Sequence, residues 1–394
     1  MTESHIPAGF LFSAATAGIK PSGKPDLALA LAPEGATAAA MFTRNQVVAA
    51  PVTIGRENLR RGQGKIRALI VNAGNANCAT GAPGLSAAKT VCSELAKYLE
   101  TSPAQVFPSS TGIIGVPLPF EKITAAIPRL LAEAGTDKLM AFATAIMTTD
   151  TKSKAASAQI SYKGSHVRLA GVAKGAGMIH PNMATMLVYL FTDVKANPKE
   201  LQSCLKRAVD QSFNNISIDG DTSTNDTVLL LASGKSHIAL KAISKQFEGV
   251  LKDVCQSLAA QIIADGEGVE HIVRLKIEQA RTTEEARQIA RAIANSPLVK
   301  TSWAGADPNW GRLLAAIGYS GVKINPEKIN IYLGKQQICR NGMAWKFDHT
   351  QAHQYMTQKE YDIRFTLGAG KAALEFLSCD LTAEYVRINA EYST

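Results

Sequence analysis

The sequence predicts an α/β protein in which helices cover sheets within closely packed lobes. Its 394 residues are 46% hydrophobic and 19% charged, a balance typical of a globular protein with a large core. Short apolar or alternating runs at 27–31, 66–71 and 186–191 predict strands, and longer amphipathic segments between such runs predict helices. No low-complexity linker or short repeat interrupts this alternation, so we expect closely packed α/β lobes rather than separate domains joined by flexible linkers.

The predicted elements repeat the order strand, polar glycine-containing loop, helix. Residues 1–72 are predicted to be rich in β-strands. A turn is predicted to follow at 72–81, because this segment is too rich in Gly and Asn for regular structure. A helix is expected from Ser86, as its N-cap, to Leu99, with a loop at 108–115. The other predictions are helices near 119–134, 138–147, 198–213, 241–264, 283–295 and from about 311, strands near 157–173, 228–231, 271–277, 327–332, 361–366 and 371–377, and loops at 218–227 and 303–312.

Charge and cysteine content exclude several classes of protein. The net charge of +9 can attract an anionic substrate, but the basic residues are dispersed and form no aromatic-interleaved stripe for nucleic acid. No run approaches the roughly 18 apolar residues of a membrane helix, and the N-terminus resembles neither a signal nor a transit peptide. We therefore expect a cytoplasmic protein with no membrane and no nucleic-acid partner. The six cysteines are scattered without metal-ligand spacing and read as reduced thiols.

Common catalytic motifs are incomplete in this chain. The run 234–236 ends like a phosphate-binding loop but lacks its first glycine, and 175–177 lacks the third glycine of a dinucleotide fingerprint, because His180 stands there. His180 is a candidate general base, although a loop histidine is more often structural. No Ser-His-Asp triad and no metal site can be assigned, and we expect no metal and no cofactor.

The segment from Lys174 to Val188 carries the strongest chemical signal. Thr185 stands where a glycine-containing loop enters an apolar strand; in isolation it would read as an ordinary strand residue. A threonine hydroxyl is a poor nucleophile and needs a base. Cleavage between Ala184 and Thr185 would supply one, the new α-amino group, with an ordinary pKa of roughly 7.7–8.0. The same hydroxyl can attack the preceding carbonyl and form an ester that water hydrolyses, so self-cleavage is chemically reasonable.

The two halves of this segment, Lys174-Gly-Ala-Gly-Met178 and Met183-Ala-Thr-Met-Leu187, resemble the self-cleavage motif of the ornithine acetyltransferase family, the glutamate N-acetyltransferases of arginine biosynthesis. The resemblance covers nearly the whole chain and its motifs occur in order. The further family-like motifs are Gly74-Asn-Ala-Asn77, Ser109-Ser-Thr-Gly112, Met147-Thr-Thr-Asp150, Asp219-Gly-Asp-Thr-Ser-Thr-Asn-Asp226, Gly305-Ala-Asp-Pro-Asn-Trp-Gly311 and Tyr385-Val-Arg-Ile-Asn389 to Thr394.

The resemblance implies a layered αββα-type sandwich with a smaller α/β lobe at the C-terminus. It also implies a precursor that cuts itself into an α chain, 1–184, and a β chain, 185–394, which stay together, commonly as a heterotetramer of two α and two β chains. The first part of the β chain would complete the main lobe, and roughly 280–394 would form the second lobe.

The implied reaction is ping-pong. Thr185 takes the acetyl group of N2-acetylornithine and passes it to glutamate; some family members also start from acetyl-CoA. Motif position implies that Thr111 and Gly112 form the oxyanion hole, where a hydroxyl and a backbone N–H suit a tetrahedral oxyanion; alone, Ser-Ser-Thr-Gly would read as a turn. The implied substrate-binding residues are Thr148, Lys174, Thr185, Glu267, Asn389 and Thr394.

Two departures from the family pattern leave alternatives open. Val269-Glu270-His271 replaces the usual Ala-Thr-Lys after Gly268, which exchanges a positive for a negative charge beside a proposed substrate contact. Residues 77–80 also invert the usual Ala-Cys order. One rival function keeps the nucleophile and uses water as acceptor, as in related self-cleaving aminopeptidases. A second rival is an uncleaved protein that binds ligand without catalysis.

Overall fold

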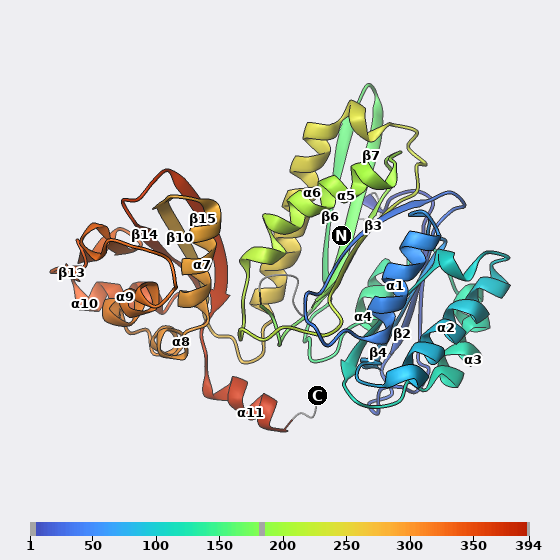
Figure 1. Ribbon diagram of the computed structural model, residues 1–394, viewed down its shortest axis with the longest axis horizontal. Helices are drawn as coiled ribbons and strands as arrows, with labels where there is room; N and C mark the ends of the chain where they lie inside the picture. The colour runs from blue at the N-terminus through green and yellow to red at the C-terminus, as the bar shows by residue number, and fades with distance from the viewer. Residues whose placement is uncertain (1–4, 181–185, 392–394) are drawn as a thin grey trace.

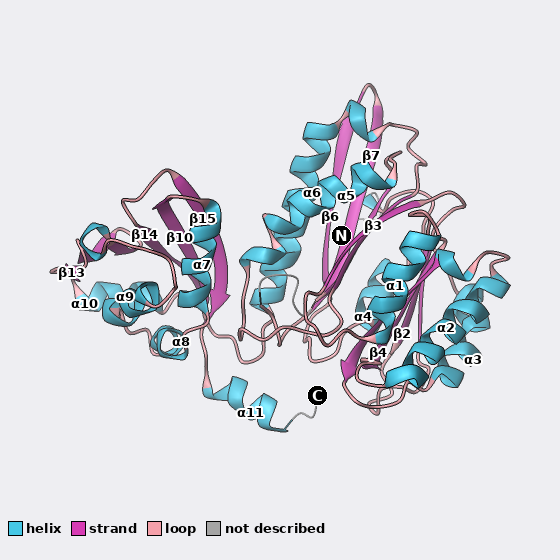
Figure 2. Ribbon diagram, in the orientation of Figure 1, coloured by secondary structure: helices cyan, strands magenta, loops and turns pink. Residues whose placement is uncertain are grey.

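The computed structural model describes residues 5–180 and 186–391, and it divides into a layered main body and a smaller C-terminal lobe (Figure 1). The main body contains two sheets stacked face to face, with helices on both outer faces (Figure 2). This arrangement confirms the layered αββα-type sandwich and the smaller α/β lobe expected from the sequence. Among the described residues, no helix combines the length and the hydrophobicity needed to cross a membrane.

One sheet of the main body has four strands in the order β1-β2-β4-β5, antiparallel except for the parallel pair of β4 and β5. Helices α1, α2 and α3 cover its outer face, and α4 packs beside β1 and β2. The bounds are β1 Leu11–Ala15, β2 Leu27–Leu31, β4 Ala68–Asn75, β5 Val106–Ile113, α1 Ala50–Arg61, α2 Gly81–Tyr98, α3 Phe120–Ala132 and α4 Leu139–Ala145.

The second sheet has five strands in the order β3-β9-β8-β7-β6, and α5 and α6 cover its outer face (Figure 1). Strands β8 and β9 follow residues 181–185 in the chain, and they lie between β3 and β7, which precede those residues. The bounds are β3 Thr37–Phe42, β6 Lys154–Tyr162, β7 Ser165–Lys174, β8 Leu187–Thr192, β9 Thr227–Ala232, α5 Pro198–Asp210 and α6 Ser244–Ala264.

Strand β8 is apolar up to its last residue, Thr192, because side chains on both of its faces are buried. Tyr189 and Phe191 point into the core between the two sheets, where Phe191 packs edge-on against Phe12. Val188 and Leu190 point the other way, into the core beneath α5 and α6. A strand covered on both faces needs no polar alternation, which explains the continuous apolar run.

The C-terminal lobe is built on a six-stranded mixed sheet in the order β13-β12-β11-β14-β10-β15, packed against α7, α8, α9 and α10. It begins with β10, somewhat before the rough boundary expected from the sequence. Helix α11 leaves this lobe and runs toward the main body (Figure 1). The bounds are β10 Ile272–Ala280, α7 Thr283–Ala294, α8 Pro297–Ala304, α9 Trp310–Gly318, β11 Asn330–Leu333, β12 Gln336–Arg340, β13 Met343–Ala344, α10 His349–Met356, β14 Glu360–Thr366, β15 Ala372–Cys379 and α11 Ala383–Glu391.

Several sequence-based boundaries are wrong. Helix α2 begins at Gly81, so Ser86 lies inside the helix and is not its N-cap. Strand β4 continues to Asn75 and β5 continues to Ile113, through segments predicted as loops, because the two strands pair in parallel and satisfy each other's backbone groups. Helix α1 lies within the stretch that reads as β-rich, and α8 takes up the start of the loop predicted at 303–312.

Candidate functional site

A cavity of about 330 Å³ opens where the ends of β5 and β7 meet the loop before β9 and the start of α11. Polar side chains from segments far apart in the sequence line it. Six residues predicted from the sequence are among them: Thr111, Gly112, Thr148, Lys174, Glu267 and Asn389. The predicted residues Ala184, Thr185 and Thr394 lie outside the described part of the chain.

Thr111 and Gly112 lie near the end of strand β5, beside the end of β4. Gly112 has φ of +132°, and a Cβ there would lie 2.3 Å from the carbonyl carbon of Gly74, so only glycine fits. The Thr111 hydroxyl accepts a hydrogen bond from Lys174 Nζ at 3.0 Å. Because a lysine ammonium only donates, the Thr111 hydroxyl keeps its own proton for a further acceptor. A developing oxyanion is one such acceptor.

Lys174, the last residue of β7, is 4% exposed. Burial lowers the pKa of its ammonium, and the negative charge of Asp150 opposes this effect most strongly. Asp226 and Glu267 also act on it as negative charges, while Lys154 acts as a positive one. Lys174 therefore places a buried amine on the cavity wall among carboxylates, and their negative charges favour the ammonium form that can meet an anionic group of a ligand.

A buried ion cluster beneath the cavity holds Lys174 in position. Lys154 Nζ lies 2.6 Å from Asp150 Oδ1 and 2.5 Å from Asp265 Oδ2, and all three side chains are buried. Asp150 also accepts from the backbone N–H groups of Gly175 at 2.7 Å and Thr148 at 3.0 Å. Burial alone would raise the pKa of Asp150, but Lys174 and Lys154 outweigh it and lower the pKa.

Asp219 joins three walls of the cavity. Its carboxylate accepts from the backbone N–H groups of Met178 at 2.5 Å and Ile179 at 2.9 Å, and from the hydroxyl of Tyr385 at 3.3 Å. Burial raises the pKa of Asp219 to about 6. The segment just before residues 181–185 is thereby tied both to the loop before β9 and to α11.

Glu267 and Asn389 meet on the side of the cavity formed by α11. Asn389 Nδ2 donates to Glu267 Oε2 at 2.8 Å, and the Glu267 backbone N–H donates to the carbonyl of Ala176 at 2.9 Å. A Cβ on Gly177 would lie 2.5 Å from Glu267 Oε2, so the glycine makes room for this carboxylate. Glu267 is suited to face an amino group of a ligand.

His180, the candidate general base, does not line the cavity among the described residues. Its Nδ1 lies 3.1 Å from Asn295 Nδ2, which can only donate, so Nδ1 accepts and the neutral ring carries its proton on Nε2. Burial is the largest cause that lowers the pKa of His180, followed by the positive charge of Arg291. These contacts fit a structural histidine between the main body and α7.

Asn225 and Asp226, like Asp219, had no role assigned from the sequence. Asn225 Nδ2 donates to the carbonyls of Ala76 at 2.7 Å and Ser110 at 2.9 Å, joining the loop before β9 to β5. Asp226 Oδ1 accepts from Met186 N at 2.8 Å, and burial raises its pKa well above the ordinary value. The sequence marked them through the polar loop predicted at 218–227 and the family-like motif at 219–226. Neither signal could show these partners, because the partners lie far away along the chain.

Comparisons with known proteins agree with one another. Residues 11–394 match the ArgJ family. The arginine biosynthesis bifunctional protein ArgJ of Methylococcus capsulatus is 44% identical over 98% of this chain and 96% of its own, and that of Chlorobaculum tepidum is 42% identical over the same shares. A crystal structure of the ArgJ protein of Bacillus halodurans is 36% identical, with a TM-score of 0.50, and it covers 52% of this chain but 98% of the solved chain. With a family match over nearly its whole length and relatives above 40% identity, the chain belongs to the ArgJ family.

Proposed function

We propose that this enzyme moves an acetyl group from N2-acetylornithine to glutamate through an acetyl-Thr185 intermediate. Membership of the ArgJ family supports acetyl transfer in arginine biosynthesis. The observation that carries the finer proposal is the cavity, where Thr111, Gly112, Lys174 and Glu267 converge from distant segments. An ammonium and a carboxylate on its walls complement the opposite charges of an amino acid substrate.

The proposed reaction has two half-reactions. The Thr185 hydroxyl attacks the acetyl carbonyl of acetylornithine, a C–O bond forms, the C–N bond breaks, and the hydroxyl proton passes through the Thr185 α-amino group to the leaving amine. The neutral glutamate amino group then attacks the ester: a new C–N bond forms, the C–O bond to Thr185 breaks, and a proton of the attacking amine passes through the Thr185 α-amino group to the released hydroxyl. In each half-reaction the Thr111 hydroxyl and the Gly112 N–H stabilise the oxyanion, a contribution of about 3–4 kcal/mol per donor.

We further propose that the chain cuts itself between Ala184 and Thr185 before it becomes active. The Bacillus halodurans ArgJ chain matches about half of this chain and nearly all of itself, so its length agrees with a fragment left by such a cut. In this chain, Asp226 holds the N–H of Met186, the residue after Thr185, and fixes one side of the proposed cleavage site. The two fragments would remain associated, and the proposed assembly is two α and two β chains.

This chemistry needs no cofactor, because the chain supplies the nucleophile and base and the substrate supplies the acetyl group. Acetyl-CoA is proposed as an alternative donor to the same hydroxyl. The contacts of Glu267 with Asn389 make this pair the part of the site that would distinguish acceptors.

The test combines denaturing mass spectrometry with an acetyl-transfer assay. We expect two fragments, the second beginning at Thr185, and formation of ornithine and N-acetylglutamate in equal amounts. Thr185→Ala should abolish cleavage and transfer together. Thr222→Ala, an exposed threonine in the loop before β9, is the matched control and should change neither.

Other outcomes separate the alternatives. Ornithine and acetate without acetylglutamate would mean that water is the acceptor, as in a hydrolase. An intact chain without turnover would support a binding protein, and cleavage that persists in Thr185→Ala would refute attack by the Thr185 hydroxyl.

A further inference from the structure

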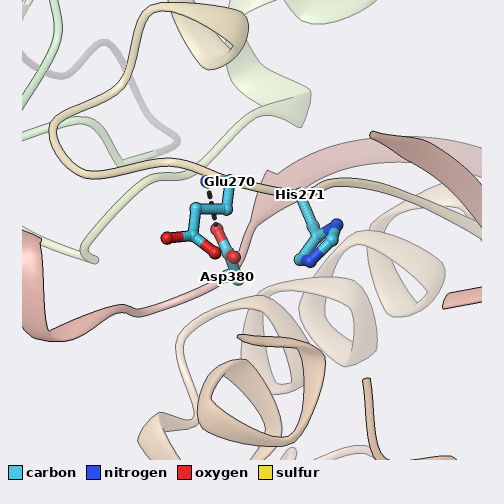
Figure 3. A group of neighbouring side chains, drawn as sticks. All are labelled: Glu270, His271 and Asp380. Atoms are coloured by element: carbon cyan, nitrogen blue, oxygen red, sulfur yellow. Dashed lines mark hydrogen bonds between the residues drawn. The ribbon is translucent and has the colours of Figure 1, made fainter. Parts of the chain in front are cut away.

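Glu270, His271 and Asp380 form a second cluster of chemically capable side chains, outside the cavity (Figure 3). Glu270 and His271 immediately precede β10, and Asp380 immediately follows β15. Because β10 and β15 are antiparallel neighbours that pair Ile272 with Cys379, both strand ends bring their side chains to one point. One ligand atom from each of the three residues lies within 4.8 Å of the others.

Asp380 is the buried member of the cluster, at 4% exposure. Its Oδ1 accepts from the backbone N–H of Glu270 at 3.1 Å. Its Oδ2 is buried and has no hydrogen-bond partner among the described residues. A buried carboxylate oxygen without a partner carries a desolvation cost that a bound cation would offset.

His271 is oriented as a ligand. Its Nδ1 lies 2.9 Å from the backbone carbonyl oxygen of Gln358, which can only accept, so Nδ1 carries a proton. In the neutral ring this leaves the Nε2 lone pair unprotonated and available to a metal. A metal-binding histidine usually has such a second bond from its other nitrogen to a carbonyl or carboxylate.

Among the described residues, no side-chain hydrogen-bond donor reaches the buried Oδ2 of Asp380, so a cation from solution could bind there. Lys300 carries a buried ammonium whose charge acts on Asp380, but its Nζ donates to the backbone carbonyl of Cys379. Backbone hydrogen bonds and the charges of His271 and Lys300 act to lower the pKa of Asp380, yet burial is the largest cause and raises it. Tyr361, whose ring lies 6.2 Å from that of His271, also has a buried hydroxyl without a partner among the described residues.

We infer that Glu270, His271 and Asp380 bind a divalent first-row transition-metal ion of the Zn²⁺ type. One imidazole with two carboxylates is a nitrogen and oxygen ligand set that suits Zn²⁺, whereas Mg²⁺ and Ca²⁺ prefer oxygen alone. Ligand atoms about 2.1 Å from a tetrahedral ion lie roughly 3.4 Å apart, so the side chains must close slightly. Glu270 is exposed and can make this movement.

The ion would cross-link the two segments that carry Glu267 and Asn389, which line the side of the cavity formed by α11. Glu270 follows Glu267 by three residues, and Asp380 leads into α11, which carries Asn389. The Thr382 hydroxyl already donates to the Gly268 carbonyl at 2.7 Å across the same junction. The ion is therefore assigned a structural role, and no acetyl-transfer step passes through it. Two of its ligands belong to the segment in which this chain departs from the family pattern.

The experiment is a calorimetric titration of the tag-free full chain, first stripped with EDTA and then desalted, with ZnCl₂. We expect one Zn²⁺ per chain, no heat with MgCl₂ at the same concentrations, and a rise in Tm of about 3 °C at a hundredfold excess over Kd. Asp380→Asn and His271→Gln should each weaken binding at least tenfold. His166→Gln, an exposed histidine on β7, is the matched control and should bind as the parent does.

Unchanged Zn²⁺ affinity in both Asp380→Asn and His271→Gln would overturn the assignment, as would binding no tighter than millimolar in the parent. Circular dichroism verifies the fold of each variant, and Glu270→Gln, at an exposed position, decides the matter if Asp380→Asn does not fold. Co²⁺ provides a second readout, because an intense thiolate-to-cobalt band would show that a cysteine binds the ion instead. All of these measurements are independent of acetyl transfer.

Discussion

Lys154→Met tests whether the buried ion cluster under the cavity stabilises the fold. Methionine keeps most of the lysine stem but removes the ammonium that lies 2.6 Å from Asp150 and 2.5 Å from Asp265. Removing one partner of a buried ion pair typically costs about 3–5 kcal/mol, because a charge is left without compensation. Here the cost should lie near the lower limit, at about 3 kcal/mol.

The remaining contacts explain this lower estimate. Asp150 keeps the charge of Lys174 and the N–H of Gly175, and Asp265 keeps the backbone N–H groups of Thr151 at 3.1 Å and Lys152 at 3.3 Å. The pKa of Asp150 is lowered in the folded state, so its contribution is present above the unfolded pKa and is lost as pH falls through the folded pKa. Without Lys154 this pKa rises, and acid unfolding should begin at a higher pH.

The assay is urea denaturation followed by circular dichroism, repeated across the acidic pH range. Lys152→Met, an exposed lysine of the same loop, is the matched control and should change the free energy of unfolding by less than about 0.5 kcal/mol. The reasoning would be refuted if Lys154→Met lowered the free energy of unfolding by less than about 1 kcal/mol, or if acid unfolding of this variant began at the same pH as in the parent. Because Asp150 also holds Thr148 and Gly175, acetyl transfer should fall along with stability.

Three further predictions concern the cavity wall. Gly112→Ala should lose transfer activity and at least about 2 kcal/mol of stability, since its Cβ would lie 2.3 Å from the carbonyl carbon of Gly74. Gly115→Ala, which has open space around it, should cost only about 1 kcal/mol of backbone strain. Urea denaturation and transfer kinetics of the two variants check both expectations. Asn225→Ala should cost about 2–3 kcal/mol in the same denaturation assay, because two buried carbonyls lose their donor, and a neutral result would contradict its bridging role. The pKa of Asp219 is raised to about 6, so its contribution to the free energy of unfolding should be full below about pH 4 and fall by roughly 3 kcal/mol as pH rises through about 6; Asp219→Asn should remove this slope.

Local sequence signals predicted much of the fold. Helix α5 begins as expected because Asn197 caps it, Pro198 occupies its first turn and Glu200 closes a capping box. The strands at 27–31 and 186–191 were recognisable because their apolar residues reflect burial on one or both faces. The loops predicted at 72–81 and 108–115 are correct only in their later parts, at 76–80 and 114–115. Their first parts are strand, and the polar side chains there are satisfied by distant partners: Asn75 Nδ2 donates to the carbonyl of Val116, and Ser109 accepts from the Tyr189 hydroxyl.

The same limit applies to the site. Thr111, Lys174 and Glu267 were named from motifs, and the structure brings them to one cavity. The sequence could not reveal that Asp219 ties α11 to the segment after β7, because that bond depends on how the C-terminal lobe docks. Nor could it reveal the meeting of Glu270 and His271 with Asp380, which depends on the pairing of β10 with β15.

The interleaved five-stranded sheet has a consequence for how a cut protein unfolds. A cut before Thr185 would leave β3, β6 and β7 on one polypeptide and β8 and β9 on the other, within a single hydrogen-bonded sheet. Unfolding would then also be dissociation, so the Tm of the cleaved protein should rise with protein concentration, whereas that of uncleaved Thr185→Ala should depend on it less. Refolding would become a bimolecular search for a partner, so the mature enzyme would be more easily lost by dilution after denaturation than its own precursor.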